Sequence, residues 1–161
     1  SDTGPGIQYT SSTTAIHVTL RDLEIVDTAD DALYFRNLAR LEIRDCLIRG
    51  SGERALEAWS NGTYTAEIVG NTILDSGSDA LFFYNVAGGL IADNTISGFN
   101  LSGATGNHSG IQVNCFGCSA DQPGLIVRDN TIQGGQGTAT GLWATSLAMA
   151  YLVRDNVFAS N

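Results

Sequence analysis

The feature that most constrains the fold of this chain is an internal repeat of about 25 residues. The segment 41–56 contains a short apolar-rich run, a Gly-Ser-Gly turn and an Arg-Ala-Leu stretch, and the segment 66–81 repeats this order without a gap. One position of the run recurs in six copies, at Ile25, Ile48, Ile73, Ile96, Ile132 and Phe158. A repeat of this length predicts a solenoid in which each copy forms one coil.

A second strand with inward and outward alternation precedes each run. Its expected inward residues are Ile7, Leu33, Leu56, Leu81, Ile111 and Leu142. The copies are 23, 25, 23, 36 and 26 residues apart, so the strands are constant and the turns vary. A coil alone would bury about five apolar side chains, worth about 2 kcal/mol each, against an ordering cost of about 1 to 2 kcal/mol per residue. The coils must therefore stack, with two or three short strands in each.

An asparagine recurs at the turn that follows the apolar run. Asn71, Asn94, Asn130 and Asn156 occupy this position, and Cys46 and Leu23 replace asparagine in the two earlier coils. Asparagine tolerates left-handed backbone angles, and its amide can bond to its own turn and to the next asparagine of a stack. We therefore expect an internal asparagine ladder with a structural role, and a buried free thiol at Cys46.

These residues carry a family resemblance. The order Ile/Val-x-x-Asn-Thr-Ile, then Asp/Ser-Gly, then Asp/Gly-Ala-Leu or Gly-Ile resembles the repeats of the pectate-lyase-like superfamily. That superfamily includes polysaccharide lyases, glycoside hydrolases, mannuronan epimerases and periplasmic copper-pathway β-helix proteins. The resemblance implies an all-β fold, a single-stranded right-handed parallel β-helix of about six coils, with residues 1–161 as one domain.

The repeat also has a second possible interpretation, and both ends of the chain lack a cap. The segment 125–132 also fits the leucine-rich repeat core L-x-L-x-x-N-x-L, but a Gly-rich turn and a second alternating strand follow it, which favours the β-helix. Neither end shows an amphipathic cap. We therefore expect open strand edges, to be covered by another chain or by further coils of a longer β-helix.

Charge and hydropathy exclude several partners. The 17 acidic residues outnumber eight arginines, there is no lysine, and the formal net charge of −9 disfavours nucleic acid and anionic membranes. No apolar run approaches the roughly 18 residues of a membrane span. The first residues lack the pattern of a signal peptide, so we expect no targeting segment within the chain. The resemblance implies an extracellular, periplasmic or cell-surface location.

The resemblance also implies that substrate lies along the outer face of the first strands. The outward residues there are Gln8, Thr10, Tyr34, Arg36, Glu57, Trp59, Phe82, Tyr84, Gln112, Asn114, Trp143 and Thr145. Aromatic rings suit the apolar faces of sugars, and the polar side chains suit hydroxyls and carboxylates. The alternative is that the aromatics only pack along their own stack. The predicted substrate-binding residues are Tyr34, Arg36, Glu57, Trp59, Phe82, Gln112, Asn114 and Trp143.

Two insertions, at 98–109 and 115–123, adjoin this face, and protruding loops of this kind usually carry specificity. Elimination or epimerisation at a uronic acid needs a base, an acid and a positive charge on the carboxylate. The candidate catalytic residues are His108, Tyr84, Arg54 and Asp79. Asp30 and Asp31 could instead bind Ca²⁺, and otherwise no cofactor is expected. The structural alternative is that Arg54 pairs with Asp31 and Asp79.

Two further patterns have mainly structural interpretations. Cys115 and Cys118 have C-x-x-C spacing, but without a second pair zinc is disfavoured, which leaves a small disulfide or two free thiols. Four Arg-Asp pairs recur on the turn opposite the proposed groove and predict surface charge ladders. They are Arg21-Asp22, Arg44-Asp45, Arg128-Asp129 and Arg154-Asp155.

The leading functional hypothesis is an extracellular β-helix that acts on an acidic polysaccharide as a lyase, C5-epimerase or hydrolase. A non-catalytic polysaccharide-binding or adhesion module could use the same aromatic face. A structural segment of a larger β-helix protein is the third possibility, because the same scaffold hosts many functions.

Overall fold

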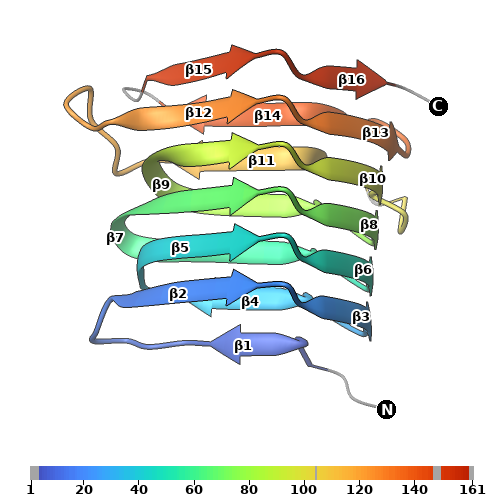
Figure 1. Cartoon of the computed structure of the whole chain (residues 1–161), viewed down its shortest axis with the longest axis horizontal. Helices are drawn as coiled ribbons and strands as arrows, with labels where there is room; N and C mark the ends of the chain where they lie inside the picture. The colour runs from blue at the N-terminus through green and yellow to red at the C-terminus, as the bar shows by residue number, and fades with distance from the viewer. Residues whose placement is uncertain (1–3, 104, 147–149, 160–161) are drawn as a thin grey trace.

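The computed structural model describes residues 4–103, 105–146 and 150–159. Every regular element in these residues is a β-strand, and the strands are wound into six coils that lie one above another (Figure 1). In chain order they are β1 (Ile7–Tyr9), β2 (Ile16–Arg21), β3 (Glu24–Thr28), β4 (Leu33–Arg36), β5 (Leu38–Arg44), β6 (Leu47–Ser51), β7 (Leu56–Val69), β8 (Thr72–Ser76), β9 (Leu81–Ala92), β10 (Thr95–Phe99), β11 (Ser109–Cys115), β12 (Gly124–Arg128), β13 (Thr131–Gly135), β14 (Thr140–Ser146), β15 (Tyr151–Arg154) and β16 (Val157–Ala159). No helix long and apolar enough to span a membrane occurs in these residues.

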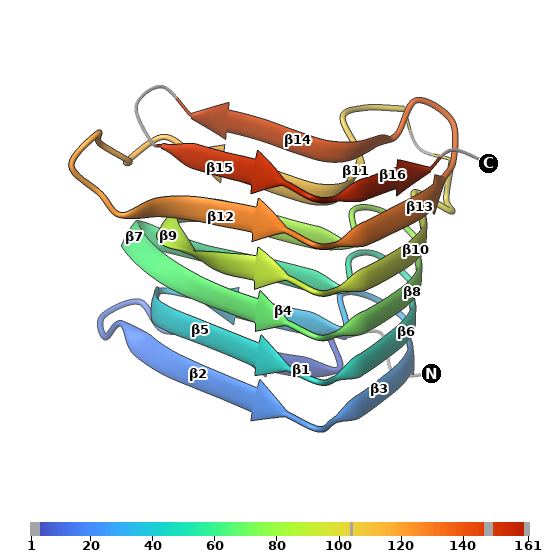
Figure 2. The same ribbon diagram turned by 45° about the horizontal axis from the view of Figure 1, so that its top comes forward.

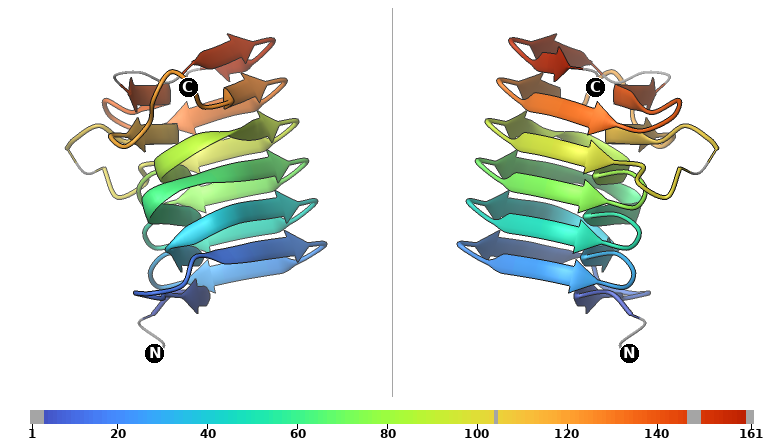
Figure 3. Two further views of the ribbon diagram at one scale, coloured as in Figure 1. Left: turned by 90° about the vertical axis from the view of Figure 1, so that its left-hand side faces the viewer. Right: turned by 90° about the vertical axis from the view of Figure 1, so that its right-hand side faces the viewer.

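The strands form three parallel stacks, which Figure 2 and Figure 3 show from further sides. The first-strand stack has the order β1-β4-β7-β9-β11-β14, the second-strand stack β2-β5-β7-β9-β12-β15, and the third-strand stack β16-β13-β10-β8-β6-β3. The long strands β7 and β9 take part in both the first and the second stack. Each strand pairs with its equivalents in the coils above and below, as the repeat predicts.

The register of the stacks confirms the predicted columns. In the third-strand stack Ile25, Ile48, Ile73, Ile96, Ile132 and Phe158 lie directly over one another. In the first-strand stack the same holds for Ile7, Leu33, Leu56, Leu81, Ile111 and Leu142. The central members of both columns are fully buried in one continuous core. This two-column core of strands confirms the β-helix over the leucine-rich alternative.

The predicted asparagine ladder is present at the turn between the second and third stacks. Asn71 donates from Nδ2 to Oδ1 of Asn94 (2.9 Å), Asn94 to Asn130 (2.9 Å), and Asn130 to Asn156 (2.9 Å). In the earlier coil the backbone N–H of Cys46 donates to Oδ1 of Asn71 (3.0 Å), and Cys46 is a buried free thiol, as predicted. The ladder therefore joins the side chains and backbone of five coils.

The backbone argument for these asparagines was wrong. The left-handed residue of each turn is the one that precedes the ladder position, with φ between 53° and 70°: Asp22, Asp45, Gly70, Asp93, Asp129 and Asp155. Aspartate and glycine tolerate this region, as asparagine does. The asparagine itself has another constraint, because its amide must point inward to meet the next coil. The turn therefore divides the two tasks between neighbouring residues.

The predicted Arg-Asp charge ladders exist only in part. Arg128 pairs with Asp129 and Arg154 with Asp155. Arg44 instead donates from Nε to Glu42 on the outer face of the second-strand stack (2.7 Å), and other arginines there pair with Glu42 as well. Arg21 and Arg44 therefore belong to a surface charge cluster around Glu42, because alternation along β5 places Glu42 on the same face as their guanidinium groups.

The two insertions leave the solenoid at opposite ends of β11. β10 ends at Phe99 and β11 begins at Ser109, whereas β11 ends at Cys115 and β12 begins at Gly124. Figure 1 shows the second insertion as an orange loop that projects on the far side of the solenoid from the yellow first one. Each insertion therefore borders one end of the first-strand stack.

The first and last described coils expose apolar side chains, as expected for open ends. The exposed residues are Tyr9, Leu23 and Val26 in the first coil and Leu152, Val153, Val157 and Phe158 in the last. The positions equivalent to Tyr9, Leu23, Val153 and Phe158 are buried in the adjacent coil, so the exposure of these four side chains comes from the open ends. Val26, Leu152 and Val157 lie at outward positions, and their partners Arg49, Ile126 and Thr131 are accessible too.

Candidate functional site

The outer face of the first-strand stack carries two columns of side chains. One column contains Gln8, Tyr34, Glu57, Phe82, Gln112 and Trp143, and the next contains Arg36, Trp59, Tyr84, Asn114 and Thr145. None of these side chains belongs to the buried core. The alternation thus places all eight predicted substrate-binding residues on one face, as expected.

Arg36 lies on this face in the second coil, at the end of β4, and aromatic rings contact it. Its guanidinium carbon is 4.3 Å from the ring centroid of Trp59 and 5.1 Å from that of Tyr34. Both distances are within the range of cation–π attraction. Arg36 forms no ion pair within the described part of the chain, so its positive charge faces the surface without a carboxylate partner.

A groove surrounds Arg36, and we refer to it as the Arg36 groove. It consists of three adjoining open depressions of about 420, 400 and 380 Å³, all of which Arg36 lines. The first is completed by Glu57, Trp59, Asn61, Phe82 and Tyr84. The second adds acidic residues near Arg54, and the third adds the hydroxyls of Thr10, Ser11 and Ser12. The groove therefore combines the Arg36 guanidinium with aromatic faces and hydrogen-bonding groups.

A column of polar residues precedes the first strands and borders the groove. Oδ1 of Asp31 accepts the backbone N–H of Arg54 (2.9 Å), and Oδ1 of Asp79 accepts the backbone N–H of Ser109 (2.7 Å). Both carboxyls are buried. Each carboxyl thus satisfies a backbone donor of the next coil, which is a structural role in addition to any chemistry.

Arg54 connects two carboxylates beside this column. Its Nη1 donates to Glu57 (2.6 Å), its Nε lies 3.5 Å from Asp79, and its guanidinium lies over the ring of Phe82 at 4.8 Å. The structural alternative for Arg54 therefore holds for Asp79. Its other side-chain partner is Glu57 and not Asp31, which meets the Arg54 backbone.

His108 approaches the same cluster from the loop before β11. Its Nδ1 lies 2.9 Å from Oγ of Ser78 and 3.8 Å from Oδ2 of Asp79. A serine–histidine–aspartate relay requires the hydroxyl and the carboxylate on opposite ring nitrogens. Because both partners meet Nδ1 here, the arrangement is not a nucleophile triad.

Tyr84 does not join the other candidate catalytic residues. His108, Arg54 and Asp79 lie together, whereas Tyr84 is five residues along the chain from Asp79, about 16 Å of extended strand. The ring of Tyr84 contacts Phe116 instead, with 5.5 Å between centroids. The structure therefore separates Tyr84 from the other predicted catalytic residues, of which only Arg54 lines the groove.

Burial alters the acidity of the two buried carboxyls. It raises the pKa of Asp31 from 3.8 to about 6, although the hydrogen bond from the Arg54 backbone opposes the rise. Burial also raises the pKa of Asp79, against the opposing effects of the Ser109 N–H, Arg54 and His108. Buried carboxyls with raised pKa values at a surface groove are a common feature of functional sites.

The raised pKa of Asp31 predicts a pH-dependent stability difference. Asp31→Asn keeps an acceptor for the Arg54 N–H and removes the ionisation. Since the folded pKa exceeds the unfolded one, ionisation destabilises the fold, and this cost is absent below pH 3.8, grows up to about pH 6 and is then constant. The free energy of unfolding of Asp31→Asn minus that of the wild type is therefore expected to increase by about 2 to 3 kcal/mol from pH 4 to pH 7. Urea unfolding at the two pH values measures this change. An equal difference at both pH values would contradict this.

Gln112 and Asn114 extend a polar chain across the face. The Gln112 amide is oriented so that its nitrogen faces acceptors and its oxygen faces a donor. Its nitrogen donates to Oδ1 of Asp79 (2.9 Å) and to the backbone oxygen of Asn107 (2.8 Å), and its oxygen accepts from Nδ2 of Asn114 (3.0 Å). Asn114 in turn accepts from the hydroxyl of Thr145 (2.6 Å). These two predicted substrate-binding residues are thus already held by protein partners, and their amides are fixed in orientation.

The donor set does not assemble a Ca²⁺ site. Asp30 and Asp31 line the same depression, but Asp31 is buried and accepts a backbone N–H. Among the described residues no group of three or more His, Cys, Asp or Glu side chains is placed to hold a metal ion. Ca²⁺ requires six to eight oxygen ligands, so these two residues alone do not fit it.

Several residues of this region were not predicted from the sequence. Asn61 lines the groove from β7 and Ser11 from the segment between β1 and β2, while Asn85 anchors the loop after β11. The one sequence signal for Asn85 was its place directly after Tyr84, the last outward residue predicted for its strand, because asparagine tolerates the left-handed conformation. Asn85 lies within β9 and its φ is 65°. The Cys115–Cys118 disulfide is formed, which decides between the two alternatives for these cysteines.

The fold and this face together define a parallel β-solenoid with an open aromatic groove on one outer side. A family model described as a right-handed β-helix region matches residues 5–161. The chain therefore belongs to the right-handed β-helix family, which agrees with the resemblance of its repeats to the pectate-lyase-like superfamily. No curated protein and no solved structure matched the chain.

Proposed function

We propose that the Arg36 groove binds a chain of acidic sugars and that the protein acts on an acidic polysaccharide. The observation that carries this proposal is Arg36, a cation held between Trp59 and Tyr34 with no carboxylate partner among the described residues. Among the eight arginines of the chain, only Arg36 and Arg49 form no ion pair within the described residues, and Arg49 lies on a different stack. Arg36 suits the carboxylate of a uronic acid, which a guanidinium can bind in a bidentate manner.

The surroundings of Arg36 suit the rest of a sugar. The half-buried rings of Trp59, Phe82 and Tyr84 offer flat apolar surfaces for the C–H faces of pyranose rings. Glu57 and Asn61 offer hydrogen-bonding groups for hydroxyls in the same depression. The open shape of the groove suits a polymer that continues beyond the site.

The disulfide supports a location outside the reducing cytosol. Cys115 and Cys118 are joined, and disulfides persist mainly in extracellular and periplasmic compartments. A polysaccharide ligand would be met in the same compartments. We therefore propose an extracellular, periplasmic or cell-surface location for the protein.

Removal of the Arg36 side chain tests this function. We expect Arg36→Ala to raise the Kd for an acidic hexasaccharide such as an oligogalacturonate about 10-fold or more, because it removes the cation that meets the carboxylate. The measurement is isothermal titration at low ionic strength, with CaCl₂ in one series and EDTA in another. Since the groove assembles no Ca²⁺ site of its own, we expect similar affinities in both series.

The matched control for this charge removal is Arg49→Ala. Arg49 is an exposed arginine on β6 in the third-strand stack, so its loss changes the net charge equally without touching the groove. We expect its Kd to stay within about twofold of the wild type. Equal weakening in both variants, or equally tight binding of a neutral hexasaccharide, would contradict recognition by Arg36.

A second candidate function is catalysis on the bound polysaccharide as a lyase, epimerase or hydrolase. The observation that favours it is the cluster of Asp79, Arg54 and His108, in which burial raises the pKa of the Asp79 carboxyl. The side chain of Asp79 is only 3% exposed and that of His108 is 19% exposed, so contact with a ligand would fall to His108.

The same oligosaccharide mixtures decide between catalysis and binding alone. Turnover is followed as absorbance of unsaturated uronates, as the NMR signal of the C5 proton, and as new reducing ends. Turnover that depends on His108 and Asp79 supports an enzyme. Binding without turnover supports the non-catalytic binding or adhesion module.

A further inference from the structure

The loop after β11 presents one apolar side chain to solvent beside the Arg36 groove. Phe116 is 67% exposed, the most exposed of the large apolar side chains in the described residues. Its ring lies 5.5 Å from that of Tyr84, which lines the groove, and Tyr84 pairs in register with Trp59. An aromatic surface therefore continues from Trp59 through Tyr84 to Phe116.

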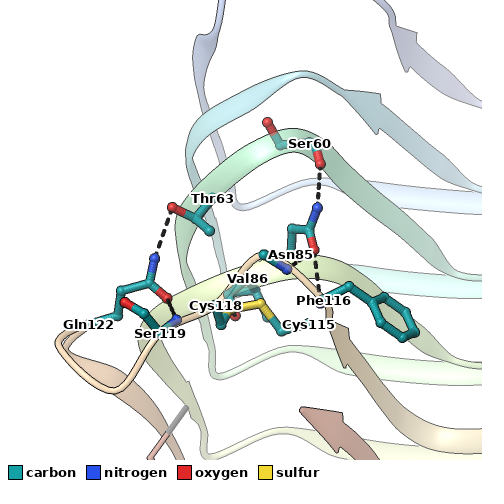
Figure 4. Close-up of a disulfide and its surroundings, with 10 residues drawn as sticks. Ser60, Thr63, Asn85, Val86, Cys115, Phe116, Cys118, Ser119 and Gln122 are labelled. Carbon is teal, nitrogen blue, oxygen red and sulfur yellow. Dashed lines mark hydrogen bonds between the residues drawn. A yellow bond between two sulfur atoms is a disulfide. The ribbon is translucent and has the colours of Figure 1, made fainter. Parts of the chain in front are cut away.

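The backbone at Phe116 is fixed by a single buried amide. Oδ1 of Asn85 accepts the N–H groups of both Phe116 (3.1 Å) and Gly117 (3.2 Å), while its Nδ2 donates to the backbone oxygen of Ser60 (3.0 Å), as Figure 4 shows. Asn85 is buried. It follows directly after Tyr84 in β9, so the same segment of β9 positions both aromatic rings.

Further contacts hold the loop on either side of Phe116. The disulfide joins Cys115 to Cys118, the residues that flank Phe116 and Gly117 (Figure 4). Cys115 is buried at the end of β11. Beyond the disulfide, Gln122 accepts from the backbone of Ser119 (3.0 Å) and donates to Thr63 in the coil of β7 (3.2 Å). An exposed phenylalanine is thus presented by a loop that is fastened on both sides.

We propose that Phe116 is a second sugar-stacking platform, which contacts the acidic saccharide chain beyond Tyr84 and which the Cys115–Cys118 disulfide preorganises. This inference rests on the proposed function of the Arg36 groove. A rigid aromatic surface binds the C–H face of a pyranose ring without the entropy cost of ordering the loop. The disulfide therefore makes the affinity for long chains sensitive to reduction by a dithiol, which transfers two electrons and two protons to form two cysteine thiols and becomes a disulfide itself.

Chain length separates this platform from the groove. We expect Phe116→Ala to raise the Kd for an acidic hexasaccharide about fivefold or more while leaving the Kd for the corresponding disaccharide unchanged. Phe116→Trp is expected to restore hexasaccharide binding. Leu101→Ala, which trims an exposed apolar side chain of the other insertion, is the matched control and is expected to have no effect.

Reduction tests the second part of the inference. Treatment of the wild-type protein with dithiothreitol is expected to raise the hexasaccharide Kd to the level of Phe116→Ala, with no further change when the Phe116→Ala protein is reduced. Circular dichroism of the reduced protein shows that the coils remain folded, and the Cys115→Ala/Cys118→Ala variant repeats the test without reductant. Unchanged hexasaccharide affinity after reduction would overturn the role of the disulfide.

The outcomes distinguish this inference from the proposed function. If binding of both saccharides depends on Arg36 but Phe116→Ala changes neither Kd, the platform is disproved and the groove stands. If Arg36→Ala changes neither Kd, or if the wild type binds neither saccharide, the proposed function fails and the platform fails with it.

Discussion

Asn94→Asp is expected to lower the free energy of unfolding by about 4 kcal/mol at pH 7, because it places an unpaired charge inside the asparagine ladder. The Asn94 amide donates to the backbone oxygen of Ile68 (2.8 Å) and to Oδ1 of Asn130 (2.9 Å), and it accepts from the backbone and side chain of Asn71 (both 2.9 Å). A carboxylate at position 94 still accepts the two bonds from Asn71. Its other oxygen, however, faces the backbone oxygen of Ile68 and Oδ1 of Asn130, which are both acceptors. The measurement is the denaturant midpoint with its slope.

The pH dependence and a matched variant identify the cause. The buried carboxylate of Asn94→Asp would have a folded pKa above the unfolded value of about 3.9, so its destabilisation is complete above the folded pKa and fades as the pH falls towards 4. Asn156→Asp makes the same change at the accessible end of the ladder, where we expect a loss of about 1 kcal/mol. Equal losses in the two variants would show that burial is not the reason.

Gly89→Ala is expected to lower the free energy of unfolding by about 3 to 5 kcal/mol. Gly89 lies in β9 between Ala66 and Leu125 of the neighbouring coils, with φ of 123°, which residues with a Cβ rarely adopt. A Cβ there would lie 1.9 Å from the backbone oxygen of Ala66, so two coils would have to separate. Chemical denaturation, with circular dichroism as the readout, measures the loss.

Gly62→Ala is the control for the loss of glycine flexibility. A Cβ at Gly62, in the bend of β7, meets no atom within 4 Å. We expect a change of less than about 0.5 kcal/mol in either direction. If Gly89→Ala were as stable as Gly62→Ala, the close approach of the two coils at Gly89 would be refuted.

Much of the candidate site was predictable because alternation assigns each strand residue to a face. Tyr34, Arg36 and Trp59 were expected to point outward on neighbouring coils, and they do so in register. The contact of Arg36 with Trp59 follows from that register, because stacked strands are about 4.8 Å apart. Its contact with Tyr34 follows from alternation, which places residues two apart on β4 on the same face. The positions of these side chains can be predicted from the period of the repeat and the two-residue period of a strand.

The remaining parts of the site were not predictable. The separation of Tyr84 from His108 depends on where the first insertion returns to the solenoid, and insertions have no repeat to follow. The Asp79 hydrogen bond to Ser109 depends on the same return. The exposure of Phe116 was not predicted, because an irregular loop has no alternation that would assign its apolar residues to the inside or the outside.

The sequence alone therefore determined the order of the coils, the two buried columns of Ile and Leu, the asparagine ladder and the outward face that carries Arg36. Each of these depends only on a residue's position within its repeat, since identical positions must lie above one another in a solenoid. The tertiary structure alone decided that Arg54 pairs with Glu57, that the left-handed residue precedes each ladder asparagine, and that Asn85 fixes Phe116 beside Tyr84. These features depend on rotamers and loop paths, which are set by packing between coils and not by the repeat.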